Sequence, residues 1–215
     1  GRFDEAAARA AFEIGNEARR AAGSPPLSWH EELAQTARAH AGDLAGRGYF
    51  DHLSPEGFDP SHRFWLVARR TIGSPAENIG SHAGSGAPAD ADRFIQAWRK
   101  SPGHWQNLLR AGHTHGAYAV VRGPRSALIV GLYFDPLAEL AEPLPFHANA
   151  PAIARALRSL PPELRPRIAI PQGARLGKVD GAPPVMQLAA LRPAAPGRFD
   201  IIGGPIFLAA ERPDA

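Results

Sequence analysis

The sequence predicts an α+β fold in which helices come first and strands follow. Up to about residue 110, apolar residues recur at three- and four-residue steps, which is the helical period. After Gly116 the pattern changes to β-branched and aromatic runs, which are typical of strands. The 215-residue chain is 44% hydrophobic, so it can bury a core and suits one large domain, or one domain with an appendage.

The expected helices have clear start and stop signals. Asp4 is a candidate N-cap for the first helix, and Gly23-Ser24-Pro25-Pro26 stops it. Ser28, with Glu31 three residues later, forms a capping-box pattern for the second helix, which ends at Gly46 and Gly48. Ser101-Pro102 places a cap residue before a proline and starts a later helix. Two further helices are expected over 61–70 and from about 89.

Two strong strands form the end of the first part. Gly116–Val121 and Ala127–Phe134 are separated by Gly123-Pro124, which predicts a hairpin. The segment 80–88 is rich in small residues, and we expect it to be flexible. We therefore expect one domain over residues 1–140, followed by a mostly β, proline-rich C-terminal appendage over 141–215. Its expected elements are a helix near 153–160 and strands near 167–170, 185–191 and 199–207, the last turning at Gly203-Gly204-Pro205.

Composition excludes several classes of function. The chain has no cysteine, which excludes disulfides, thiolate zinc sites and cysteine nucleophiles. Net charge is +3 with scattered arginines, so no nucleic-acid partner is expected. No apolar run approaches 18 residues, so no transmembrane segment is expected. Gly173–Lys178 and Gly84-Ser85-Gly86 each lack residues that phosphate or dinucleotide loops require.

Six of the nine histidines lie between Tyr49 and Gly116, and they mark the expected site. Glu77 lies in an apolar run within this stretch, and a buried carboxylate there must meet a partner. His113 and His115 are two residues apart, so on a strand they would share a face and could hold one metal ion. His104 follows a helix start, where a neutral, supporting ring is favoured. Four other histidines of the chain are expected at the surface: His30, His40, His62 and His82.

Five short motifs in order resemble the bacterial branch of the CAP superfamily. This superfamily comprises the cysteine-rich secretory, antigen 5 and pathogenesis-related 1 proteins, which share the SCP domain. The resemblance covers roughly Asp4 to Pro136. The motifs are Asn16–Gly23 with Pro26–Trp29, Phe50–Gly57, Ala76–Ile79, Ser101–His104 with Asn107–Leu109, and Gly131–Phe134.

The resemblance implies a three-layer α-β-α sandwich with a central antiparallel sheet and a cleft lined by histidines and acids. It makes His52 the first histidine and Glu77 the first acid. Ser101 stands at the usual position of the second acid, and His113 or His115 is the second histidine. Some members bind zinc there, which implies His52, His115 or His113, and Glu77 as ligands. The expected ligand cleft therefore contains His52, Glu77, Ser101, His104, His113 and His115.

The function implied by the resemblance is a non-enzymatic binding or envelope-associated role outside the cytoplasm, in a secreted or periplasmic protein. The expected ligand is Zn²⁺ or another divalent metal, or else a small apolar molecule, a lipid or a glycan. The extension 141–215 is a candidate surface for a protein partner. The alternative is a metal-assisted hydrolase, a peptidase or esterase, with Glu77 as base and the cleft histidines, including His52, holding the metal.

Overall fold

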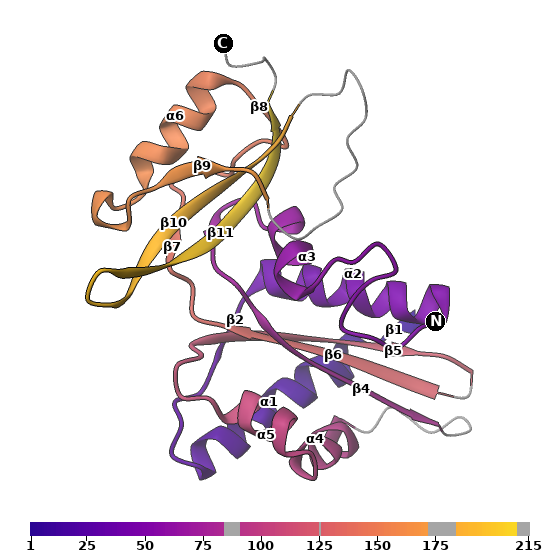
Figure 1. Ribbon diagram of the computed structural model, residues 1–215. Coiled ribbons are helices and arrows are strands. Elements are labelled where there is room, and N and C mark those ends of the chain that lie inside the picture. The colour runs from indigo at the N-terminus through magenta and orange to yellow at the C-terminus, as the bar shows by residue number, and fades with distance from the viewer. Residues whose placement is uncertain (84–90, 125, 172–183, 210–215) are drawn as a thin grey trace. The chain divides into compact units, whose positions relative to one another are not determined.

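The structure is a computed structural model that describes residues 1–83, 91–124, 126–171 and 184–209. The chain divides into two compact units, Gly1–His52 with Pro75–Asp135, and Leu53–Ser74 with Pro136–Ala215 (Figure 1). This division differs from the expected domains 1–140 and 141–215, because Leu53–Ser74 groups with the C-terminal residues. Ile72 lies in their hydrophobic core, and its strand pairs with residues 138–139.

The first unit is a three-layer sandwich around an antiparallel sheet with the order β1-β5-β6-β4, as predicted (Figure 1). Helix α2 contacts β5 and β6 on one face, and α1, α4 and α5 cover the other face. β2 pairs with β5 in parallel. The helices are α1 (Glu5–Ala21), α2 (Glu31–Arg47), α4 (Ala91–Arg99) and α5 (Pro102–Leu109). The strands are β1 (Arg2–Phe3), β2 (Ser28–Trp29), β4 (Ala76–Ala83), β5 (His115–Arg122) and β6 (Ser126–Phe134).

Helices α1 and α2 bury most of the apolar positions that the helical period predicts. Asp4 caps α1 as expected, with its Oδ1 accepting from the Ala7 backbone N at 2.9 Å. The capping box expected at Ser28 is wrong, because Ser28 belongs to β2 and His30 is the N-cap of α2. Gly48 ends α2 in the left-handed conformation, with φ 70°, which glycine adopts without steric cost.

β4 is a strand that the sequence did not predict. Its eight residues pair with β6 along their whole length, although Gly80–Ala83 was expected to be flexible. The small residue at Gly80 has a packing reason, since a Cβ there would lie 3.1 Å from Ile129 and 3.2 Å from Trp98. The rest of that expected flexible segment, from 84 to 88, lies outside the described residues, as do the two loop-like motifs 84–86 and 173–178.

The second unit contains a four-stranded sheet with the order β8-β11-β10-β9, which confirms the mostly β extension. The turn expected at Gly203-Gly204-Pro205 is wrong, because β11 runs through these residues. The strands are β3 (Thr71–Ile72), β7 (Ala138–Glu139), β8 (His147–Ala148), β9 (Arg167–Ala169), β10 (Val185–Ala195) and β11 (Arg198–Ala209). The helices are α3 (Pro60–Val67), α6 (Ala150–Ser159) and the 3-10 turn η1 (Pro162–Leu164).

His62 in this unit was expected at the surface, and that prediction is wrong. It is the third residue of α3 and is buried, at 5% exposure. Asp59 accepts from its backbone N at 2.8 Å, and the His62 ring accepts from the Asp59 backbone N, which makes a reciprocal capping box. Across the described parts of the chain, no helix is long and apolar enough to cross a membrane.

Candidate functional site

Glu77 and His52 form the centre of the candidate site. The sequence predicted that a buried Glu77 would meet a partner. The Glu77 side chain is 1% exposed, and its Oε1 lies 2.8 Å from Nδ1 of His52, whose side chain is 49% exposed. An ionised carboxylate only accepts, so Nδ1 carries the proton. When the His52 ring is neutral, its lone pair is on Nε2, the atom that can then accept a proton or bind a ligand.

A second imidazole lies on the buried side of the same carboxylate. Nε2 of His40, on α2, lies 3.7 Å from Glu77 Oε1 and 3.2 Å from the carbonyl oxygen of Asp51. His40 was expected at the surface, and that prediction is wrong because its side chain is fully buried. His40 therefore contacts Glu77 from the buried side, and its bond to Asp51 links α2 to the loop that carries His52.

Asn78 and Asn107 fix α5 against the edge strand β4. Asn78 Nδ2 donates to the carbonyl of His104 at 3.0 Å, and its Oδ1 accepts from Asn107 Nδ2 at 3.0 Å. Asn107 also donates to the backbone oxygen of Glu77 at 3.3 Å. These bonds satisfy buried polar groups and hold His104 at a set place beside β4.

Ser101 and His104 form a second polar pair at the start of α5. Ser101 is the N-cap residue, but its hydroxyl makes no capping bond and instead lies 2.7 Å from Nδ1 of His104. Burial, and to a smaller extent the nearby charge of His52, lowers the pKa of His104 below its usual value. The ring is therefore neutral at pH 7, as expected, and it stacks on Trp98 at 6.3 Å.

A pocket of about 380 Å³ opens beside this pair. Its apolar lining includes Phe50, Phe94 and Trp98, and its polar lining includes Ser101 and His104. Pockets of this kind, largely apolar with a few placed polar groups, are the usual form of small-molecule sites. His104 lies near enough to His52 for the charge of that residue to lower the pKa of His104, so the pocket and the His52–Glu77 pair are neighbours.

His113 and His115, the expected second histidines, have other partners. His113 is 6% exposed, lies with Nε2 3.2 Å from Asn107 Oδ1 and stacks on Tyr133 at 5.8 Å. His115 Nδ1 lies 2.9 Å from the Thr114 hydroxyl. His115 lies on β5, and β6 separates β5 from β4 in the sheet. The His115 backbone is therefore about 10 Å or more from that of Glu77.

The donor set does not fit a zinc centre with three protein ligands. Among the described residues, no three His, Cys, Asp or Glu side chains come together as a group that could hold a metal ion. Glu77 is engaged with His52, and the ring of His113 donates from Nε2 to Asn107. Zinc binding at His52 with His115 or His113 therefore stays a prediction, and we derive no chemical step from it.

Comparisons with known proteins identify the family to which residues 12–134 are similar. A family model described as the cysteine-rich secretory protein family, CAP, matches residues 12–134. The uncharacterized protein YkwD of Bacillus subtilis (strain 168) is 35% identical over 106 residues, which cover 48% of this chain and 38% of YkwD. The chain thus spans well under half the length of this relative.

Two solved structures are similar to part of this chain. An outer surface protein from Borrelia burgdorferi has a TM-score of 0.50 at 17% identity, over 60% of this chain and 91% of that chain, and shares the fold. An extracellular SCP-domain protein from Bacillus anthracis gives a TM-score of 0.48 at 23% identity, over 60% and 41% of the two chains. The family model matches more than half of the residues of this cysteine-free chain, which therefore belongs to the cysteine-rich secretory protein (CAP) family.

Proposed function

We propose that this protein binds a small molecule in the pocket beside the His52–Glu77 pair. The observation that carries the proposal is a half-exposed imidazole oriented by a buried carboxylate, next to a pocket with an aromatic lining. The apolar part of the ligand would contact Phe50, Phe94 and Trp98. Its polar part would hydrogen-bond to His52 Nε2 or to His104.

We also propose that the protein works outside the cytoplasm. Family membership supports this location, and so does the shared fold of a protein that is itself described as an outer surface protein. A lipid or glycan remains among the candidate ligands, and a protein partner for residues 141–215 stays a prediction. Comparing secreted and cell-associated fractions of a producing bacterium tests the location, and recovery only from the cytoplasm would refute it.

The binding site is tested with a pair of matched variants. Phe50 lines the pocket and is 51% exposed, so Phe50→Ser removes an apolar wall without opening the core. Phe146 is 47% exposed and lies outside this lining, so Phe146→Ser is the control. With the fluorescent probe 8-anilinonaphthalene-1-sulfonate, we expect weaker binding in Phe50→Ser and unchanged binding in Phe146→Ser. Equal binding by wild type and Phe50→Ser refutes the pocket as the site.

A second candidate function is hydrolysis, in which the Glu77–His52 pair acts as the general base. The specific observation is that Glu77 orients His52 with the basic atom Nε2 directed away from the carboxylate, the arrangement of a general base. A peptidase and esterase screen on wild type and Glu77→Ala decides between the two. Turnover in wild type that Glu77→Ala abolishes supports hydrolysis, and equal or absent turnover in both rules it out.

Zinc is tested separately, by thermal unfolding at pH 7 with added Zn²⁺ and with EDTA. A metal that binds the folded state alone raises the unfolding temperature as its concentration rises. His52→Ala should remove that shift, since His52 is in every predicted ligand set. No shift with either reagent in wild type refutes the zinc prediction and leaves the small-molecule proposal standing.

A further inference from the structure

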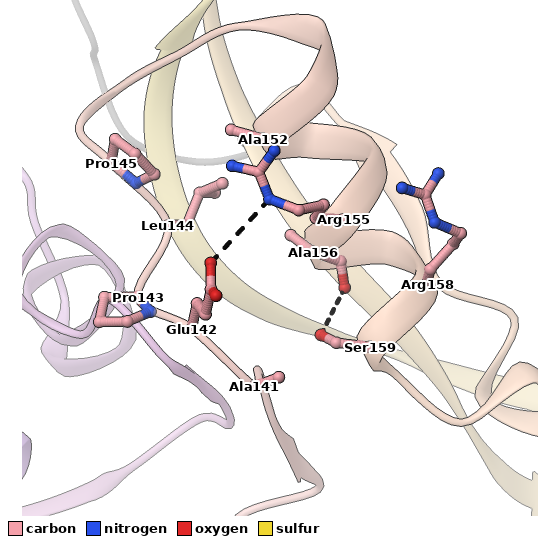
Figure 2. A pocket seen from close by; sticks show the side chains of 10 residues that line it. All are labelled: Ala141, Glu142, Pro143, Leu144, Pro145, Ala152, Arg155, Ala156, Arg158 and Ser159. Atoms are coloured by element: carbon pink, nitrogen blue, oxygen red, sulfur yellow. Dashed lines mark hydrogen bonds and ion pairs between the residues drawn. The ribbon is translucent and has the colours of Figure 1, made fainter.

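A separate pocket of about 390 Å³ lies wholly within the second unit (Figure 2). One wall is α6, which contributes Ala152 and Ala156, and the other is the segment 141–145. Pro143, Leu144 and Pro145 make this second wall apolar, and the charged groups Glu142 and Arg155 lie at the rim.

The wall formed by 141–145 is preformed. Leu144 N donates to the backbone oxygen of Arg69 at 2.7 Å, and Arg69 Nε donates to the oxygen of Leu144 at 2.9 Å. Arg70 Nη2 donates to the oxygen of Ala141 at 2.8 Å. These bonds hold the segment in place, so a ligand would not have to order it on binding.

The rim carries a positive charge that is only loosely compensated. Arg155 Nε lies 3.9 Å from Glu142 Oε2, which is beyond hydrogen-bonding distance, and the two side chains are 60% and 78% exposed (Figure 2). Such exposed pairs contribute little. Arg158 adds a second positive charge to the lining, so the acid at the rim is outnumbered.

We propose that this pocket binds a small organic carboxylate. The carboxylate takes the place of Glu142 on the Arg155 guanidinium, where two parallel hydrogen bonds are possible. The apolar body of the ligand lies against Pro143, Leu144 and Ala156. The loose Arg155–Glu142 pair is the contact that the ligand's own carboxylate replaces.

The ligand class is tested by titration calorimetry of the whole chain with three probes. Hexanoate carries both an apolar body and a charge, hexanamide is its neutral counterpart, and acetate has the charge without the body. We expect hexanoate to bind about ten-fold more tightly than either of the others, because each lacks one of the two contacts. Equal binding of hexanamide, or no saturable hexanoate binding in the millimolar range, refutes the proposal.

Three exposed substitutions locate the binding. Arg155→Gln should weaken hexanoate binding about ten-fold. Glu142→Gln removes the competing carboxylate and should tighten binding about two- to five-fold. Arg198→Gln removes one charge from an exposed position of β11 outside the pocket and should change nothing. Weaker binding in Glu142→Gln would show that the ligand does not compete with this carboxylate and would overturn the site. Equal losses in the two arginine variants would assign the effect to general charge and would also overturn it.

The other pocket, beside His52, could also take an apolar carboxylate, so one more comparison separates the two. Hexanoate affinity should be the same in Phe50→Ser as in wild type, because Phe50 lines only the first unit's pocket. A loss in Phe50→Ser with no loss in Arg155→Gln would place the carboxylate in the first unit and refute this inference.

Discussion

Acid should destabilise this fold through His113, which the structure buries between α5 and β6. Burial first, and then the charges of Arg110 and Arg19, lowers the pKa of His113 from 6.5 to about 4, while Asp135 acts in the opposite direction. The ring stacks on Tyr133, and its Nε2 lies 3.2 Å from Asn107 Oδ1. Protonation would place a positive charge in this buried site.

The size of the effect follows from proton linkage. Between pH 6.5 and about 4 the unfolded chain binds a proton at His113 and the folded chain does not, so the free energy of unfolding rises with pH over this range. The stabilisation is complete above pH 6.5 and is lost as the pH falls. The loss from His113 alone is about 2 kcal/mol at pH 5 and about 3 kcal/mol at pH 4.

Urea unfolding at several pH values between 7 and 4 measures this directly. His113→Gln keeps a donor for Asn107 but cannot titrate, so its free energy of unfolding should fall less steeply with pH than that of wild type. The difference between the two slopes isolates His113 from the other titrating groups. Parallel curves, or an NMR titration of His113 near 6.5 in the folded protein, would refute the argument and return His113 to the list of candidate cleft ligands.

Three further substitutions test the packing around the site by urea unfolding. Arg19→Met removes a fully buried guanidinium that donates to four backbone carbonyls, and should lower the free energy of unfolding by about 3 kcal/mol. The control Arg20→Met changes an exposed arginine and should have little effect. Gly131→Ala should cost about 1–3 kcal/mol because its Cβ would lie 2.5 Å from a buried tyrosine ring, whereas Gly46→Ala, with open space, should stabilise α2 by up to about 1 kcal/mol. Glu77→Ala leaves a buried imidazole without its acid and should cost about 2 kcal/mol; no change would argue against the buried pair.

Secondary structure could be predicted from the sequence wherever it depends on residues that are close together in the chain. The hairpin over Gly116–Phe134 and the first helix follow from local periodicity and from a cap, and both are present. His40 could also have been found this way. It lies three residues after Ala37 and four before Leu44, on the buried stripe of α2, so its spacing already indicated the core rather than the surface.

Other features depend on pairings between distant segments, which local patterns do not contain. β4 is rich in small residues and became a strand because β6 pairs with it. The segment 53–74 joins the C-terminal unit through Ile72 and through Arg69, whose partners lie about 75 residues or more further along. The two histidines His113 and His115 do not share a strand, since β5 begins only at His115.

The position of the site follows from two successive residues on the edge strand. Side chains alternate along a strand, so Glu77 and Asn78 point to opposite faces of the sheet. Glu77 meets His40 and His52 on the α2 face, and Asn78 meets the backbone of His104 on the α5 face. A one-residue slip of β4 would exchange the two faces and bury the carboxylate against α5. The Glu-Asn order, together with the register of β4 on β6, is therefore what brings an acid, an exposed imidazole and the start of α5 to the same edge.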